Sequence, residues 1–170
     1  MAVSLRPLAL LAAGLIALMG QAFAAPIASP TGDPILVVSG SIANTNDGDV
    51  ARFDRAMLEA IGTVKLTTLT PWYDRPTEFE GVSMRALMAY VGAEGTEVVA
   101  SALNDYQSEI PMADFDRFDV VLALKRDGVP MPIRDKGPLF IVYPFDSDRQ
   151  LQTEQYYSRS VWQVKELNVR

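Results

Sequence analysis

The chain has 170 residues, a formal net charge of −6 at pH 7, and neither cysteine nor histidine. The absence of both residue types excludes Ser-His-Asp and Cys-His catalysis, disulfides and thiolate metal ligands. A zinc site would need carboxylate ligands alone, which is unusual for that metal. The acidic balance also argues against a nucleic-acid backbone as the binding partner.

The first 24 residues have the pattern of a signal peptide. Arg6 precedes an uncharged, Leu- and Ala-rich stretch from Leu8 to Met19, and Ala22-Phe23-Ala24 fits the small-x-small cleavage pattern. The apolar stretch is shorter than the roughly 20 residues that span a bilayer, although an uncleaved anchor is an alternative. We therefore expect export with cleavage near Ala24, a flexible Pro/Gly/Ser-rich lead-in over residues 25–34, and one domain over residues 35–170.

Apolar residues at helical spacing predict two short helices. The first is expected over residues 50–61, with Asp49 as its N-cap and Gly62 as its stop. The second is expected after Ser83, because apolar side chains recur there at the i, i+3, i+4, i+7 spacing until Gly92 ends the pattern.

Short apolar or alternating runs predict the strands. These runs cover residues 35–38, 64–70, 97–103, 106–110, 119–125, 139–143 and 161–169. Asp127-Gly128 is a strong hairpin-turn signal. The last run alternates imperfectly, since Trp162 and Val164 should point away from Leu167 and Val169. The order of elements predicts an α+β domain with a mainly β core.

Two groups of oxygen-bearing side chains have a structural and a functional interpretation. Residues 44–49 resemble a calcium loop in composition but lack the regular spacing of an EF-hand, so a turn is the simpler interpretation. Asp114, Asp116 and Asp119 could include a catalytic acid–base pair, but nothing in the sequence separates their environments. We expect them to form a solvated acidic edge.

Three polar-aromatic clusters are the candidate ligand contacts. They lie at residues 70–75, 104–106 and 156–160, and each combines a flat ring or a guanidinium with fixed donors and acceptors. Such a set can recognise a planar heterocycle by stacking and edge hydrogen bonds. The candidate residues are Trp72, Asn104, Asp105, Tyr106, Tyr157, Ser158 and Arg159. The structural alternatives are a core position for Trp72, an Asx turn at Asn104-Asp105 and a surface ion pair for Arg159.

The order of motifs resembles the molybdopterin-binding domain of the sulfite-oxidase family. The matching stretches are Trp72 with 79–87, then 105–111, 118–123 with 128–131, 136–144 and 160–162. The resemblance implies a single sulfite-oxidase-like fold with two or three short helices. In that family a cysteine shortly before the tryptophan binds molybdenum. Here Thr68 or Thr70 stands near that position, and Phe140 replaces a common arginine.

A threonine hydroxyl is a poor replacement for a thiolate on molybdenum. The resemblance therefore implies a pterin pocket, and the alternative is a molybdenum cofactor in a molybdopterin-dependent oxidoreductase or a subunit of a redox complex. The third possibility is a scaffold whose pocket is vestigial.

The short, exported, cysteine-free form is similar to periplasmic pterin-binding regulators. The matching stretches are residues 70–72, 102–106 and 156–162. The resemblance implies a periplasmic protein that binds a reduced pterin without molybdenum. It also implies action on the periplasmic domain of a membrane signalling protein, such as a cyclic di-GMP enzyme.

The chemistry of the candidate residues suggests how they would divide the contacts with a pterin. The ring would stack on Trp72 or a neighbouring tyrosine, and its amino-pyrimidinone edge would meet Asp105 or Asn104. Arg159 with Ser158 would hold ligand oxygens.

Overall fold

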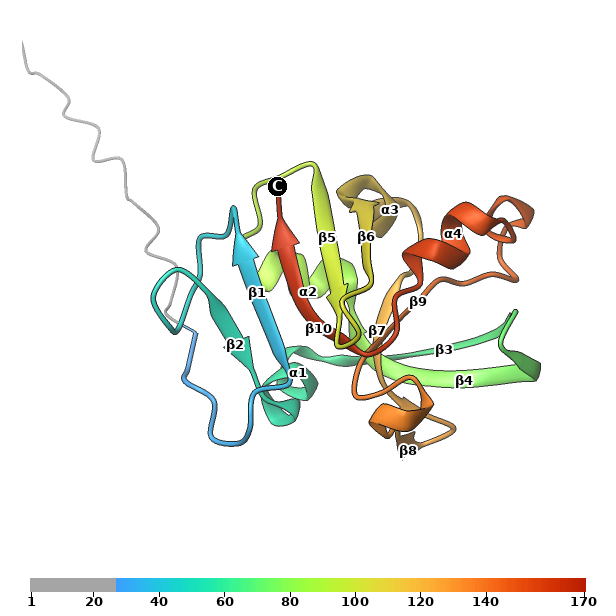
Figure 1. Ribbon diagram of the computed structural model, residues 1–170, viewed down its shortest axis with the longest axis horizontal. Coiled ribbons are helices and arrows are strands. Elements are labelled where there is room, and N and C mark those ends of the chain that lie inside the picture. The colour runs from blue at the N-terminus through green and yellow to red at the C-terminus, as the bar shows by residue number, and fades with distance from the viewer. Residues whose placement is uncertain (1–26) are drawn as a thin grey trace, which may run out of the picture.

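The computed structural model describes residues 27–170, which form two five-stranded sheets with short helices around them (Figure 1). The predicted signal peptide lies outside the described residues. Within residues 27–170, no helix is both long and apolar enough to cross a membrane. The predicted α+β class with a mainly β core is confirmed, and the structure has four short α-helices where two or three were expected.

The first sheet has the strand order β2-β1-β10-β5-β6. Its strands are β1 (Leu36–Gly40), β2 (Ala51–Phe53), β5 (Glu97–Ala102), β6 (Gln107–Pro111) and β10 (Val164–Val169). β1 runs parallel to β10, and the other neighbours are antiparallel. The last strand of the chain is thus the central strand of this sheet and holds the N-terminal and middle segments together.

The second sheet has the strand order β3-β4-β7-β8, and β9 also pairs with β7. Its strands are β3 (Thr63–Thr70), β4 (Tyr73–Ser83), β7 (Val121–Arg126), β8 (Val129–Pro130) and β9 (Phe140–Val142). All of its neighbours are antiparallel. β3 and β4 form a long hairpin that projects away from the first sheet (Figure 1).

The helices are short and lie between strands. They are α1 (Arg55–Ile61), α2 (Met84–Tyr90), α3 (Met112–Arg117), α4 (Glu154–Arg159) and the 3-10 turns η1 (Ile133–Asp135) and η2 (Arg149–Leu151). Ser83 precedes α2 as predicted, although its side chain makes no capping hydrogen bond. The apolar face of α2 is buried, as its spacing predicted.

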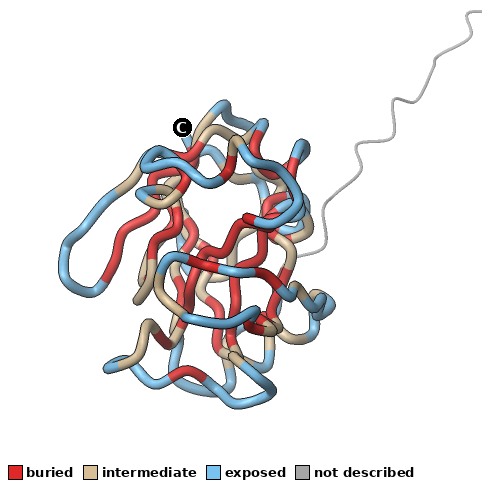
Figure 2. Tube along the Cα trace, turned by 90° about the vertical axis from the view of Figure 1, so that its right-hand side faces the viewer, coloured by how far each residue is buried: buried red, intermediate tan, exposed pale blue. Residues whose placement is uncertain are grey.

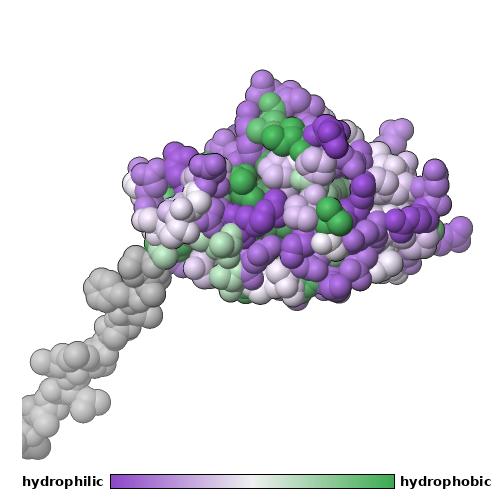
Figure 3. All heavy atoms as spheres, turned by 90° about the horizontal axis from the view of Figure 1, so that it is seen from below, coloured by the Kyte–Doolittle hydropathy of each residue, from purple (hydrophilic) through white to green (hydrophobic). Residues whose placement is uncertain are grey.

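β7 and β9 divide the interior into two hydrophobic clusters. Leu122 and Leu124 face the larger cluster with Ile141, while Val121 and Phe140 face the smaller one. Because side chains alternate along a strand, a strand covered on both faces has a continuous apolar sequence. Figure 2 shows the resulting buried stretches inside a rim of exposed turns. The face in Figure 3 is mostly hydrophilic, with small, separate apolar patches.

The helix predicted over residues 50–61 is wrong in its first part. Residues 51–53 form β2 and pair with β1, and the helix begins only at Arg55. Its N-cap is Asp54, whose side chain accepts the backbone N–H of Met57, and not Asp49. Pairing with β1 overrides the helical spacing of the three residues. Gly62 ends the helix as predicted, with a φ of 120°.

Leaving aside the two-residue strand β8 and the two 3-10 turns, three elements have no counterpart in the prediction: β4, α3 and α4. β4 contains Pro76 and Gly81, which are residues that normally weaken a strand assignment. Gly81 is needed there because a Cβ atom would lie 2.0 Å from the carbonyl oxygen of Leu122 on β7. The two helices have only six residues each, too few for a clear apolar repeat.

The imperfect alternation of the final run has a structural cause. β10 begins at Val164 rather than at residue 161, and a bulge between Val164 and Glu166 shifts its register against β5. Val164 is therefore buried in the same hydrophobic cluster as Leu167 and Val169, which corrects the predicted facing.

Residues 44–49 form a turn, as the simpler interpretation predicted. The Asn46 side chain accepts the backbone N–H of Arg52 and donates to the carbonyl oxygens of Ala28 and Arg52. Asp47 pairs with the Arg52 guanidinium. Within residues 27–170, no three acidic side chains gather closely enough to hold a metal ion.

The lead-in before β1 is attached to the domain through Asp54. Its carboxylate accepts the backbone N–H groups of Thr31 and Gly32 at 2.9 and 2.8 Å, and Ile27 is buried in the larger cluster. These contacts differ from the flexible segment that its composition indicated. The N–H donors, led by that of Met57, lower the pKa of Asp54 below its usual value of 3.8.

We expect Asp54→Ala to lower the melting temperature by several degrees at neutral pH, because four N–H or O–H donors lose their acceptor. Since the folded-state pKa is depressed, the stabilisation is present above pH 3.8 and is lost as the pH falls below it. Thermal unfolding of both proteins between pH 7 and pH 3 checks this. If the difference in melting temperature between the unmodified protein and Asp54→Ala grew towards acid pH, the stabilising role of the ionised Asp54 carboxylate would be contradicted.

Candidate functional site

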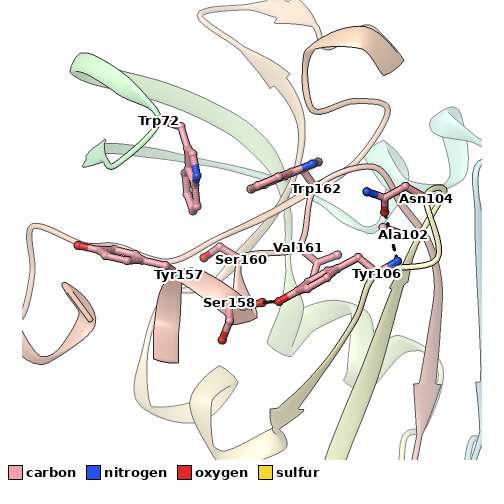
Figure 4. Close-up of a pocket in the computed structure, with 9 residues that line it drawn as sticks. All are labelled: Trp72, Ala102, Asn104, Tyr106, Tyr157, Ser158, Ser160, Val161 and Trp162. Atoms are coloured by element: carbon pink, nitrogen blue, oxygen red, sulfur yellow. Dashed lines mark hydrogen bonds between the residues drawn. The ribbon is translucent and has the colours of Figure 1, made fainter. Parts of the chain in front are cut away.

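A cavity of about 320 Å³ opens where the β3–β4 turn, the β5–β6 turn and α4 come together (Figure 4). Its lining residues are Trp72, Ala102, Asn104, Tyr106, Tyr157, Ser158, Ser160, Val161 and Trp162. The volume is at the lower end of the range for ligand pockets, so it has room for one small ligand.

Aromatic rings form the main wall of the cavity. The indole of Trp72 lies edge-on to Trp162 and Tyr157, with ring centroids 5.6 and 6.2 Å apart. Behind this wall, Trp72 also packs edge-on against Phe140 at 5.4 Å. These edge-to-face contacts fix the rings relative to one another. Trp72, Trp162 and Tyr157 are only partly buried, which leaves ring surface for a flat ligand to stack on.

Hydrogen-bond donors point into the space beside the rings. The backbone N–H of Tyr106 donates to Oδ1 of Asn104 at 3.2 Å, which orients the amide so that its nitrogen faces Trp162 (Figure 4). Within the described chain, this nitrogen and the indole nitrogens of Trp72 and Trp162 have no acceptor. Because the lining contains no carboxylate, the cavity is suited to acceptor atoms such as ring nitrogens and carbonyl oxygens.

One hydrogen bond joins two walls of the cavity. The hydroxyl of Tyr106 donates to the backbone carbonyl of Ser158 at 3.0 Å and so links the β5–β6 turn to α4. The same turn is tied to the segment before β10, since the backbone N–H of Leu103 donates to the carbonyl of Gln163. The cavity is therefore held by contacts between segments far apart in sequence.

The structure brings together five of the seven residues that the sequence singled out. Trp72, Asn104, Tyr106, Tyr157 and Ser158 all line the cavity. They come from all three predicted clusters, which lie about 30 and 50 residues apart along the chain. Asp105 and Arg159 do not line it.

Asp105 points away from the cavity. It has a φ of 65° in the β5–β6 turn, its side chain is 89% exposed, and its carboxylate pairs with Lys165 at 2.9 Å. The hydrogen bond and charge of Lys165 lower the pKa of this carboxyl. Of the two residues expected to meet the pyrimidinone edge, Asn104 lines the cavity with its amide and Asp105 does not line it.

Arg159 is part of a buried polar cluster beneath α4. Its guanidinium donates to Asp114 at 2.9 Å, and the hydroxyl of Tyr143 donates to the same carboxylate oxygen at 2.8 Å. The side chains of Arg159 and Asp114 are only 14% and 10% exposed. Burial, reinforced by Asp114, raises the pKa of Tyr143 well above its usual value. The predicted solvated acidic edge thus holds for Asp116 and Asp119 but not for Asp114.

Four lining residues were not among the predicted contacts: Ala102, Ser160, Val161 and Trp162. Trp162 is the most consequential of them, because its ring is one of the three that form the aromatic wall. The sequence placed it inside the last strand, whereas β10 begins two residues later and leaves the ring outside that strand. The nearby tyrosines of the third cluster, Tyr156 and Tyr157, were the sequence signal that could have identified Trp162 as a lining residue.

Comparison with known families identifies the central part of the chain. The family model described as the oxidoreductase molybdopterin binding domain matches residues 57–146, which is more than half of the chain. This match includes the lining residues from Trp72 to Tyr106 and ends before α4. No curated protein matches the chain.

The residues at the expected molybdenum-ligand position do not fit that metal. The hydroxyl of Thr68 donates to the carbonyl of Leu69 and accepts the backbone N–H of Asp146, and the hydroxyl of Thr70 accepts the N–H of Trp72. Both hydroxyls are thus used within the fold, and the sequence contains no cysteine. The aromatic rings and N–H donors, by contrast, fit the organic part of a pterin cofactor.

We expect Arg159→Met to lower the free energy of unfolding by about 2–4 kcal/mol, because it leaves the buried carboxylate of Asp114 without its cation. Adding Asp114→Asn should restore part of this loss. Urea unfolding of the single and double variants measures both effects. Unchanged stability in Arg159→Met, together with lost ligand affinity, would instead favour the sequence-based role of Arg159 as a ligand contact.

Proposed function

The chain belongs to the oxidoreductase molybdopterin-binding domain family, and we propose that its aromatic cavity binds a reduced pterin without molybdenum. The observation that carries this proposal is the pairing of ring faces with unused N–H donors in a cavity sized for one bicyclic heterocycle. The absence of cysteine from the sequence supports the metal-free form.

The lining residues suggest a division of labour. The pterin ring stacks on one face of the wall formed by Trp72, Trp162 and Tyr157, whose rings are steeply inclined to one another. The amide nitrogen of Asn104 donates to an acceptor on the pyrimidinone edge, and the indole N–H groups are available to the remaining acceptors. The volume accommodates the ring, so a longer substituent extends towards solvent.

We further propose that the protein works in the periplasm and regulates a membrane signalling partner such as a cyclic di-GMP enzyme. The support for this is the signal-peptide pattern of residues 1–24 and the resemblance of residues 70–72, 102–106 and 156–162 to periplasmic pterin-binding regulators. Pterin occupancy is the signal, and contact with the periplasmic domain of the partner transmits it.

The sharpest test of the ligand site is an isosteric exchange. Asn104→Asp keeps Oδ1 for the N–H of Tyr106 but replaces the amide donor with a carboxylate. We expect it to weaken tetrahydropterin binding by about tenfold or more, since a donor becomes a repulsive acceptor. Calorimetric titration under anaerobic conditions measures the affinity.

Asp105→Asn is the matched control, because it makes the opposite exchange at the next residue, outside the cavity. The affinity of this variant for tetrahydropterin should stay within about twofold of that of the unmodified protein. If Asp105→Asn bound tetrahydropterin tenfold more weakly and Asn104→Asp bound it with unchanged affinity, Asp105 would be the ligand contact. An unmodified protein that takes up no tetrahydropterin would overturn the proposed function.

The signalling role has a separate test in cells. Loss of the protein should change the cyclic di-GMP level, and Asn104→Asp should reproduce that change while Asp105→Asn does not. Fractionation should recover the mature protein with the periplasmic contents. A cyclic di-GMP level that is the same with and without the protein would contradict the proposed partner class.

A further inference from the structure

Lys136 places its ammonium group directly against the aromatic wall. It follows η1 with a left-handed φ of 63°. Its Nζ lies 4.4 Å from the ring centroid of Trp162, 5.7 Å from that of Trp72 and 5.9 Å from that of Tyr73. All three distances are within the range of cation–π attraction. Lys136 itself does not line the cavity, so the two tryptophan rings connect it to the ligand space.

The ammonium of Lys136 lies near the carboxylate of Asp135 but forms no ion pair with it. Within residues 27–170, no carboxylate lies at ion-pair distance from its Nζ. Its neighbour Asp135 instead pairs with Arg126 at 2.8 Å, and Arg126 also donates to the hydroxyl of Tyr73. Burial among the rings removes part of the hydration of the Lys136 ammonium and so lowers its pKa.

Two other cations near the cavity are each paired with a carboxylate. Lys165 pairs with Asp105 on the β5–β6 side, and Arg159 pairs with Asp114 beneath α4. Lys136 thus brings a positive charge to the aromatic wall, although the whole chain has a net charge of −6. A weakly hydrated charge acts over several ångströms, because aromatic rings screen it much less than water does.

We propose that Lys136 is a specificity-determining residue that favours pterins bearing a negative charge over neutral pterins with the same ring. This inference rests on the proposed pterin binding and narrows its ligand class to anionic derivatives. A carboxylate on the ring substituent gains Coulomb attraction from the ammonium behind the wall. A neutral substituent gains only the weaker polarisation of the ring system.

The test compares two ligands that differ mainly in this charge, the tetrahydro forms of 6-carboxypterin and 6-hydroxymethylpterin. Anaerobic calorimetry should show that the unmodified protein binds the carboxylate about tenfold more tightly. Lys136→Met keeps an apolar stem against the rings but removes the charge, and the preference should fall to within about twofold. Lys136→Arg keeps the charge and should keep most of the preference.

Lys165→Met is the control for a lysine at the rim, and it should leave the preference intact because Lys165 is half-exposed and paired. Thermal unfolding establishes that each variant is folded, with Lys136→Gln as the replacement should Lys136→Met not fold. Equal affinity for both ligands, or a preference that survives loss of the charge, overturns the role of Lys136 while pterin binding stands. Failure to bind either ligand overturns both proposals.

Discussion

The packing of Trp72 is the constraint on which the rest of the site depends. Its ring contacts Phe140, Phe145, Tyr157 and Trp162, all edge-on. These partners come from β9, from the segment after it, from α4 and from the segment before β10. Trp72 also touches both hydrophobic clusters. One side chain at the tip of the β3–β4 hairpin thus completes the core and forms the cavity wall, so the wall is rigid before any ligand arrives.

The polar residues near the cavity divide into those that hold the walls and those left for a ligand. Arg159, Asp114 and Tyr143 satisfy one another beneath α4, and Asp105 and Lys165 do so at the surface. Among residues 27–170, the groups without a partner at the cavity include the N–H donors of Asn104, Trp72 and Trp162. Hydrogen-bond donors of this kind suit a ligand that carries acceptor atoms.

Local sequence patterns predicted the elements that are set by local chemistry. Asp127-Gly128 makes the expected turn, Gly62 ends α1, and the continuous apolar runs that become β7 and β9 are buried on both faces. Sequence patterns failed to predict elements whose secondary structure is determined by pairing with a segment distant in the sequence. Residues 51–53 pair with β1, and Gly81 allows β4 to approach β7 closely. Neither contact leaves a periodic signal in the sequence.

The candidate site shows the same division. Residue chemistry selected three clusters whose rings and amides do meet in space, because stacking and hydrogen bonding need those residue types. It could not distinguish Asn104 from Asp105, since a left-handed turn residue decides which of two neighbours faces the cavity. Nor could it assign Arg159 to the core, because its partner Asp114 lies on α3, a helix too short to be recognised.

The central claim is that a pterin-binding fold is used here without its metal. Its most direct test is the native content of the protein purified from the cells that produce it, by elemental analysis and by fluorescence and mass of the released ligand. We predict a pterin in stoichiometric amount and no molybdenum. Stoichiometric molybdenum with molybdopterin would contradict the claim and favour a redox enzyme. An empty protein that also fails to take up added pterin would contradict it in favour of a scaffold.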